Sequence, residues 1–421
     1  MENLDVMDGP ATDLGLACRS CAAKSLVPVI DFGALPLANS LVRGEDLQAS
    51  EDRFPLALFF CPQCTLVQIG ETISPDRLFR HYLYASSFSQ TMVDHAQGLT
   101  QRLTKERSLT NQSLVVEIAS NDGYLLQFYR EQGIDVLGIE PARNIAEIAE
   151  RERGIPTITE FFGPELAARL RKDGHEADVI HAHNVFAHVP HPAHIIAGCK
   201  ALLKPDGLVL IEAPYVGELI RKLEFDTIYH EHFSYFSLTS VNNLVQQHAM
   251  MIADVELVPI HGGSLRLFIA HEGAATASQN VQDMLAREED EGLTKLEHYS
   301  DFAERIDELG RKLNATLKDL KAKGHSIAAY GASAKGSTLM NAFGISPDLI
   351  DFVADRSTLK QGYYTPGNHI PIVAPEELMV RRPDYVLLLT WNFADEILEQ
   401  QSEYRNAGGR FILPLPDVQV V

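Results

Sequence analysis

The chain has 421 residues, of which 45% are hydrophobic and 22% charged, a composition typical of soluble globular proteins. Its 57 acidic residues outnumber the 36 basic ones and give a net charge of −21, which argues against broad nucleic-acid binding, because that requires basic patches. No apolar run approaches the roughly 20 residues of a membrane helix, and the acidic start of the chain is unlike a signal peptide. We therefore expect a cytoplasmic protein of two or three domains with neither a nucleic acid nor a membrane as partner.

Four of the five cysteines form two pairs, Cys18 with Cys21 and Cys61 with Cys64. Two residues between ligands allow both sulfurs of a pair to reach one tetrahedral metal ion. Disulfides are the alternative, which a cytoplasmic location disfavours. Because four thiolates leave no open position on Zn²⁺, the pattern predicts a structural zinc ion in an amino-terminal zinc-binding domain over residues 1–75.

Strands alternate with helices from about residue 114 onward. We expect strands at 114–118, 136–139, 179–184 and 207–211, with helices at 124–132 and 142–152. This alternation predicts a parallel, doubly wound sheet in a Rossmann-like domain over residues 76–275.

The loop after the first of these strands indicates the ligand. It holds only Gly123, whereas a nicotinamide dinucleotide needs Gly-x-Gly-x-x-Gly beside its pyrophosphate. S-adenosylmethionine carries no phosphate and tolerates such a loop, and Glu140 ends the second strand where a carboxylate can bind both ribose hydroxyls. A ligand-free Rossmann-like domain stays an alternative. The expected cofactor-binding residues are Glu117, Ala119, Ser120, Asn121, Gly123, Glu140 and Asn184.

The segment Tyr229-His230-Glu231-His232 places a phenol, two imidazoles and a carboxylate in four consecutive residues after the strand at 207–211. Ligands of open α/β folds bind at the carboxyl edge of the sheet. Aromatic neighbours should partly bury the cluster. We therefore interpret it as an active site rather than a solvated surface loop. The flanking aromatic residues are Phe225, Phe233, Tyr235 and Phe236.

Residues 276–421 are expected to hold a long amphipathic helix over about 281–323, with one break allowed, and then a second Rossmann-like domain. Strands are predicted at 326–330, 349–353 and 385–389. Small residues, hydroxyls and one lysine follow the first of them and suit a phosphate at a helix amino end. The expected substrate-binding residues are Ser333, Lys335, Arg356 and Tyr363.

Five motifs in order along the chain resemble those of the S-adenosylmethionine-dependent sugar C-methyltransferases. The motifs are the cysteine pairs and the segments 117–126, 184–189, 229–234 and 261–266. The resemblance implies an enzyme that methylates carbon 3 of a nucleotide-linked, commonly dTDP-linked, 4-keto-6-deoxy sugar through an enolate. One departure is Ala119, where the family usually has glycine, and its methyl group could narrow the approach of the backbone to the cofactor.

This chemistry needs a base for the proton on carbon 3 and donors to the enolate oxygen. Imidazole titrates near neutrality, so we assign the base to His232. Glu231 could either orient His232 or bind a sugar hydroxyl. Tyr229 and His188 are the candidate donors to the enolate oxygen. The resemblance also places Tyr84 in a lid over the methyl donor.

Two other functions are considered. An NAD(P)-dependent sugar-nucleotide oxidoreductase or epimerase could use the carboxyl-terminal Rossmann-like domain, and a zinc-ribbon adaptor could bind a partner without catalysis. The missing glycine fingerprint disfavours the oxidoreductase or epimerase. The cluster at 229–232 disfavours the adaptor. A monomer is the expected state, whereas the sequence identifies neither the sugar nor its nucleotide.

Overall fold

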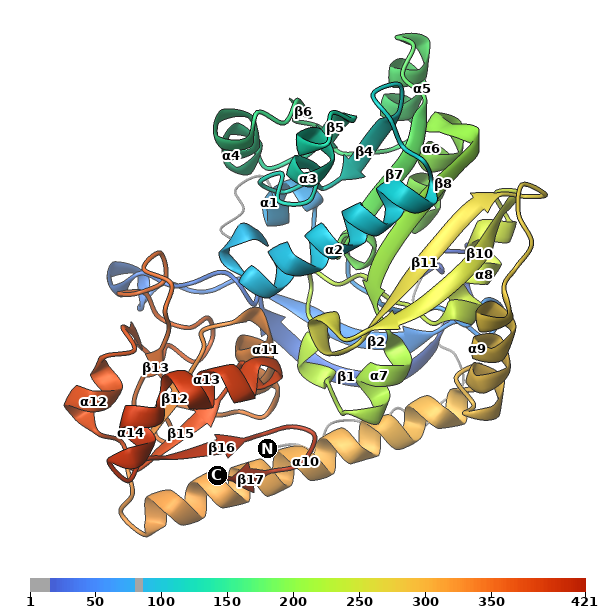
Figure 1. Cartoon of the computed structure of the whole chain (residues 1–421). Coiled ribbons are helices and arrows are strands. Elements are labelled where there is room, and N and C mark those ends of the chain that lie inside the picture. Colours follow the sequence, from blue (N-terminus) through green and yellow to red (C-terminus); the bar gives the residue numbers. More distant parts are fainter. Residues whose placement is uncertain (1–15, 80–85) are drawn as a thin grey trace.

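The computed structural model describes residues 16–79 and 86–421, so Tyr84 lies outside the described residues. The described chain contains three sheets, of four, seven and six strands, with helices around the two larger ones (Figure 1). The expected fold class, mixed α/β with two Rossmann-like parts behind an amino-terminal cysteine cluster, is confirmed. None of the described helices is long and apolar enough to cross a membrane.

The first sheet is antiparallel, with the order β1-β2-β3-β9. Its first three strands are β1 (Val27–Pro36), β2 (Arg53–Phe60) and β3 (Val67–Ile69), and short helices η1 (Gly44–Asp46) and α1 (Pro75–Phe79) flank them. The fourth strand, β9 (Ser234–Tyr235), comes from far along the chain and pairs with β3. This pairing was not predicted.

The central sheet has the order β10-β11-β8-β7-β4-β5-β6. Five strands are parallel: β4 (Leu114–Ile118), β5 (Asp135–Ile139), β6 (Thr157–Ile158), β7 (Ala177–His183) and β8 (Leu203–Pro214). The hairpin of β10 (Met250–Val258) and β11 (Ser264–His271) adds on through β11, which runs antiparallel to β8. The four expected strands are present, but the hairpin and β6 were not predicted.

Alternating side chains of the central strands enter separate cores on the two faces, because successive residues of a strand point in opposite directions. Val115 and Val179 pack with helices α2 and α3, whereas Val116 and Ile180 join the core under α5 and α6. The helices and 3₁₀ turns of this part are α2 (Gln90–Glu106), α3 (Leu126–Glu131), α4 (Arg143–Arg153), α5 (Pro164–Lys172), α6 (Pro192–Leu202), α7 (Val216–Arg221), α8 (Leu238–Gln246), η2 (Ser86–Phe88), η3 (Phe186–His188), η4 (Phe225–Thr227) and η5 (Ile260–Gly262).

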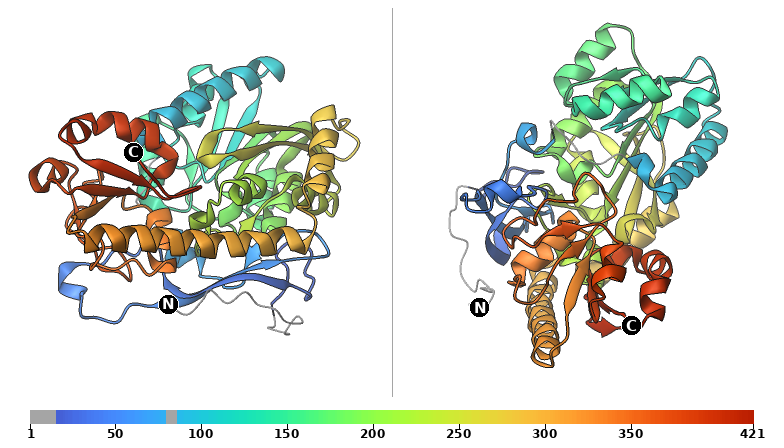
Figure 2. Two further views of the ribbon diagram at one scale, coloured as in Figure 1. Left: turned by 90° about the horizontal axis from the view of Figure 1, so that it is seen from below. Right: turned by 90° about the vertical axis from the view of Figure 1, so that its left-hand side faces the viewer.

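The expected broken helix forms α9 (Gln279–Asp290) and α10 (Leu296–Ala322), with the break at Gly292, whose φ is 80°. Helix α10 has 27 residues and is therefore about 40 Å long. It runs along both the amino-terminal strands and the carboxyl-terminal part (Figure 2). At its amino end the Tyr299 ring lies 5.0 Å from the Phe60 ring of β2, so α10 joins the first sheet to the third.

The third sheet has the order β14-β13-β12-β15-β16-β17, parallel except for β17. Its elements are β12 (Ile327–Tyr330), α11 (Ala334–Ala342), β13 (Val353–Ala354), β14 (Ile372–Val373), α12 (Glu377–Arg381), β15 (Tyr385–Leu388), η6 (Trp391–Phe393), α13 (Ala394–Gln400), α14 (Ser402–Asn406), β16 (Arg410–Leu413) and β17 (Gln419–Val420). The strand expected at 349–353 was wrong in extent. The amides of Leu349 and Ile350 both donate to the carbonyl of Ser346, so this segment turns. Backbone hydrogen bonds to β12 begin at Asp351, whose amide donates to the carbonyl of Ile327, and the strand β13 itself begins at Val353.

Candidate active site

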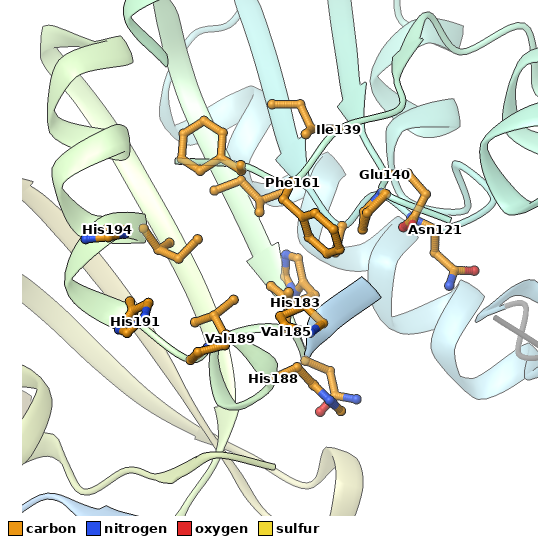
Figure 3. A pocket seen from close by; sticks show the side chains of 18 of the residues that line it. Asn121, Ile139, Glu140, Phe161, His183, Val185, His188, Val189, His191 and His194 are labelled. Carbon is orange, nitrogen blue, oxygen red and sulfur yellow. The ribbon is translucent and has the colours of Figure 1, made fainter. Parts of the chain in front are cut away.

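A cavity of about 460 Å³ lies at the carboxyl edge of the central sheet (Figure 3). Ala119, Asn121, Glu140, Asn184 and His188 line it, all of them expected site residues. Three other expected cofactor residues do not: they are Glu117, Ser120 and Gly123. The cavity is therefore bordered by the loops after β4, β5 and β7, as expected for a ligand of an open α/β sheet.

The loop after β4 has a left-handed backbone. Ala119 has φ 53°, Asn121 has φ 50° and Gly123 has φ 78°. A Cβ added to Gly123 would lie 2.8 Å from Ile155 Cγ1, so glycine is required there. Ala119 adopts a conformation that costs an L residue about 1–2 kcal/mol, which explains why glycine suits this position.

Glu140 follows β5 and holds that loop in place. Its Oε1 accepts from the amide of Ala142 at 2.8 Å, and its Oε2 accepts from the amide of Asn121 at 3.0 Å. Burial nevertheless raises the pKa of Glu140 to about 7. A carboxylate in this place, at the edge of the cavity, is suited to the ribose hydroxyls of an adenosine cofactor.

Two residues of the cavity wall were missed by sequence reasoning. Phe161 lies beside Glu140 (Figure 3) and is 38% exposed although aromatic, and Phe162 lines the cavity next to it. A flat apolar surface next to a ribose-binding acid suits the adenine ring. The pair follows the two-residue strand β6, which has no periodicity that sequence reasoning could detect.

His183, which also lines the cavity, is held in a single orientation by hydrogen bonds to Glu212 and His181. Its Nδ1 lies 3.0 Å from a Glu212 carboxylate oxygen, which can only accept, so Nδ1 carries the proton. Its Nε2 then accepts from His181 Nδ1 at 2.8 Å, and His181 Nε2 accepts from the Tyr129 hydroxyl at 2.9 Å. Burial opposes ionisation of Glu212, but His183, then a hydrogen bond from His95 and then the charge of Arg266 hold the pKa of this carboxyl well below its usual value.

The cluster at 229–232 lies between η4 and β9. His232 Nδ1 is 2.7 Å from the carbonyl oxygen of Thr227, so Nδ1 donates, and the lone pair is on Nε2. Nε2 lies 3.1 Å from the Tyr229 hydroxyl. The ring of His188, a residue of the cavity wall, is 4.5 Å from the His232 ring. The structure therefore brings Tyr229, His232 and His188 together beside the cavity.

Glu231 points toward the amino-terminal part of the chain. Its Oε1 accepts from Asn39 Nδ2 at 2.6 Å, and burial raises the pKa of Glu231 to about 7. Asn39 follows β1 in a segment with no catalytic motif, so nothing in the sequence indicated it. His230 faces away, with Nε2 donating to the carbonyl oxygens of Phe54 and Pro55 at 3.1 and 3.2 Å.

The four cysteine sulfurs lie within 4.8 Å of one another. The Cys18 and Cys64 sulfurs are 3.4 Å apart and those of Cys21 and Cys61 3.6 Å apart, close to the roughly 3.8 Å that Zn–S bonds of 2.3 Å give in a tetrahedron. The set fits a structural zinc ion and leaves no position for a substrate.

Arg19, inside the first cysteine pair, connects the zinc site to the cavity. Its guanidinium donates to the Thr72 hydroxyl at 2.8 Å and to the Pro190 carbonyl at 3.3 Å. Thr72 and Pro190 both line the cavity. The position of the cavity wall therefore depends on the metal-bound turn.

The four expected substrate-binding residues do not form one cluster. Ser333 and Lys335 lie at the amino end of α11, where the Ser333 hydroxyl caps the helix by accepting from the amide of Gly336 at 3.0 Å. Arg356 is on the surface and lies 3.7 Å from Glu396. The carbonyl of Tyr363 accepts from the amide of Ile372 in β14 at 2.8 Å, and its amide donates to the carbonyl of Lys360.

The class of protein follows from the central sheet and its cavity. The sheet is parallel except for one antiparallel hairpin, the cavity lies at its carboxyl edge, and an acid follows its second strand. These features are those of a methyltransferase that uses S-adenosylmethionine. Three family models match the chain: "Putative zinc binding domain" over residues 18–79, "Methyltransferase domain" over 92–248 and "C-methyltransferase C-terminal domain" over 259–416. The chain belongs to the C-methyltransferase family. Its cofactors are S-adenosylmethionine and a structural zinc ion.

C-methyltransferase NovU of Streptomyces niveus is 38% identical over 405 residues, 96% of each chain. The ubiquinone biosynthesis O-methyltransferase of Burkholderia pseudomallei is 22% identical over 38% of this chain and 73% of its own length. Among solved structures, the magnesium protoporphyrin IX methyltransferase of Synechocystis PCC 6803 is 14% identical over 43% of this chain and 83% of its own, with a TM-score of 0.35, too low to carry an argument. The family assignment rests on the full-length relative.

Replacing Ala119 with glycine is expected to raise stability by up to about 1 kcal/mol, because glycine adopts a positive φ without strain. It should also lower the Kd for S-adenosylmethionine severalfold, since Ala119 lines the cavity. Thermal unfolding and calorimetric titration measure the two effects. Ala142→Gly is the matched control, because Ala142 has φ −80° and should lose stability. If Ala119→Gly lowered the Tm as much as Ala142→Gly does, Ala119 would not be strained.

Binding of S-adenosylmethionine is expected to weaken as the pH falls from 8 to 6. The ionised Glu140 is expected to accept from both ribose hydroxyls, and because its pKa is about 7, its protonation should raise the Kd about tenfold at pH 6. The free energy of unfolding of the ligand-free protein should change in the opposite direction. Because folding raises the pKa of Glu140, this group stabilises the folded state at low pH, and the stabilisation is lost as the pH rises through 7. Titrations of wild type and Glu140→Gln with S-adenosylmethionine between pH 6 and 8 test this. The same change of Kd with pH in both proteins would refute it.

Removal of zinc is expected to lower both the stability and the affinity for S-adenosylmethionine, because Arg19 loses its fixed position. Cys61→Ser should lose the metal and several kcal/mol of stability. Cys199→Ala is the control: this buried thiol lies in α6, so the variant should keep one zinc per chain. Metal content, Tm and cofactor Kd are measured, and a Cys61→Ser protein without zinc but with wild-type affinity would refute the link to the cavity.

Proposed function

We propose that the protein transfers a methyl group to carbon 3 of a nucleotide-linked, dTDP-linked in the first instance, 4-keto-6-deoxy sugar. The observation that carries the proposal is the fixed tautomer of His232, whose Nε2 lone pair lies beside the Tyr229 hydroxyl and the His188 ring. A base with two possible donors is the set that enolisation of a ketone needs. The full-length relationship to a C-methyltransferase supports carbon as the acceptor.

The reaction begins with a proton transfer on the substrate. His232 Nε2 takes the proton from carbon 3, the electrons of that C–H bond form the carbon–carbon double bond, and the carbonyl electrons move to the oxygen. Tyr229 and His188 donate to this oxygen and stabilise its charge. Bound S-adenosylmethionine supplies the methyl group that carbon 3 receives.

The contact between Tyr229 and His232 gives these steps an order. In the resting site the Tyr229 hydroxyl donates to His232 Nε2 at 3.1 Å. Once Nε2 carries the substrate proton it no longer accepts, and the phenol O–H is released toward the enolate oxygen. Proton abstraction and stabilisation of the enolate are thereby linked.

Glu231 and Asn39 are proposed to position the sugar. Burial raises the pKa of Glu231 to about 7, so at neutral pH its carboxyl group can either donate to or accept from a sugar hydroxyl. Asn39 fixes one of its oxygens. Tyr84 is retained as a lid residue on the resemblance alone.

The nucleotide diphosphate is proposed to lie at the amino end of α11, with Ser333 and Lys335 as its first contacts and Arg356 and Tyr363 as outer ones. Three sheets support domain limits of 1–75, 76–275 and 276–421, apart from β9, which joins the first sheet. We further propose that the protein is a monomer and that this sugar nucleotide is its binding partner.

His232→Ala is expected to reduce turnover of a dTDP-linked 4-keto-6-deoxy sugar by at least 10²-fold, the usual contribution of a general base. Its Kd for S-adenosylmethionine should stay within twofold of wild type. In heavy water the variant should also lose deuterium incorporation at carbon 3, measured by mass spectrometry without the methyl donor. His248→Ala, at the end of α8, is the histidine control. If His232→Ala still incorporated deuterium at carbon 3, another residue would be the base.

A further inference from the structure

A row of polar side chains crosses the central sheet and ends at the cofactor cavity. His183 of β7 is in register with Glu212 of β8, and Glu212 is in register with Arg266 of β11. Arg266 in turn is paired with Glu256 of β10. Side chains in register on neighbouring strands lie side by side on one face of a sheet. Arg266 ends the segment 261–266, one of the five motifs of the sequence, which has no part in the proposed reaction.

Glu212 is the buried carboxylate at the centre of this row, and it is 5% exposed. Its Oε1 accepts from Arg266 Nε at 2.5 Å, and its Oε2 lies 3.0 Å from both His183 Nδ1 and His95 Nε2. Arg266 also donates to Glu256 at 2.8 Å, so its positive charge is divided between two carboxylates. Glu212 therefore keeps part of its negative charge on the side of His183.

The ring of His183 carries this charge to the cavity. Its Nδ1 donates to Glu212 and its Nε2 accepts from His181, so the ring is uncharged and both nitrogens are engaged. A hydrogen bond to a carboxylate makes an imidazole ring richer in electrons. His183 lines the cavity, and Figure 3 shows its ring between Phe161 and His188. An electron-rich surface backed by a buried anion thus borders the middle of the cavity.

The cofactor changes its charge during the reaction. S-adenosylmethionine carries a sulfonium cation, whereas S-adenosylhomocysteine is an uncharged thioether, because the electrons of the broken sulfur–methyl bond stay on sulfur. The sulfur joins the adenosine, expected at Glu140 and Phe161, to the methyl group, which is directed to the reaction centre at His188. A sulfonium between these two places lies at His183. A cation is stabilised by an electron-rich ring and by a buried anion, and a thioether is not.

We propose that Glu212, acting through His183, is the counter-charge of the sulfonium group and lowers the Kd of S-adenosylmethionine relative to that of S-adenosylhomocysteine. Glu212 is then a positioning residue that distinguishes the methyl donor from the product. Two other carboxyl groups line the cavity. Asp76 is exposed, so water screens its charge, and Glu140 is assigned to the ribose, which both forms of the cofactor share.

The test is calorimetric titration of the full-length, zinc-bound protein with S-adenosylmethionine and, separately, with S-adenosylhomocysteine. Glu212→Gln retains volume and should raise the Kd of S-adenosylmethionine roughly fivefold or more, while the Kd of S-adenosylhomocysteine stays within about twofold of wild type. If Glu212→Gln fails to fold, the double variant with Arg266→Met is used. It leaves no unpaired buried charge, because Glu256 keeps its ion pair with Arg102, and the same change of the Kd ratio is expected.

Glu256→Gln is the matched control. It removes a half-buried carboxylate from the same row, two strands farther from the cavity than Glu212, so it should lower stability without changing the ratio of the two Kd values. Glu140→Gln should weaken both ligands by the same factor, since both contain the ribose.

A wild-type ratio in Glu212→Gln, or in the double variant where it replaces it, would overturn the inference. An equal rise of both Kd values in Glu212→Gln would also overturn it, because Glu212 would then maintain only the shape of the cavity. If Glu140→Gln changed the ratio as much as Glu212→Gln, the counter-charge would be Glu140 instead. Because no sugar is present in these titrations, none of the outcomes bears on the proposed acceptor.

Discussion

The pairing of β9 with β3 is the contact on which the arrangement of the reaction centre depends. Phe233, immediately after His232, accepts through its carbonyl from the amide of Ile69 at 3.1 Å and donates through its amide to the carbonyl of Ala187 at 2.7 Å. Ala187 precedes His188. One residue therefore ties the zinc-bearing sheet, the catalytic loop and the wall of the cofactor cavity to one another by backbone hydrogen bonds.

This constraint explains why three distant segments hold their side chains in register. The hydrogen bonds of Phe233 hold the backbone next to His232 against the backbone next to His188, and the tautomer of His232 is fixed by Thr227, two residues before Tyr229. Catalysis gains from such preorganisation, because a misplacement of about 1 Å can cost 10²-fold in rate. We therefore expect the zinc ion to act on the chemistry through geometry, because Cys61 and Cys64 lie between β2 and β3 of the sheet to which the loop at 229–233 is hydrogen-bonded.

Local signals in the sequence predicted the local features well. Paired cysteines, apolar strands ending in acids and a long amphipathic helix with one break all have short-range causes, and the structure confirms them. The features that were missed depend on contacts between distant residues: β9 has two residues and no period, and Asn39 meets Glu231 across 192 positions. Phe161 becomes a cavity wall only once β6 has joined the sheet. The strand expected from Leu349 was lost to a turn at Ser346, a local hydrogen bond that outweighed β-propensity.

The proposed reaction centre borders the cofactor cavity and takes its residues from two segments. The cavity is built from the loops after β4, β5 and β7, whereas Tyr229 and His232 come from the loop between η4 and β9. His188 connects the two, because it lines the cavity and its ring lies 4.5 Å from the His232 ring. In the proposed reaction a cofactor in the cavity therefore approaches the sugar from the side of His188. The loop would supply the base and the cavity the methyl source, so the proposed transfer to carbon depends on the hydrogen bonds that hold the loop against the cavity wall.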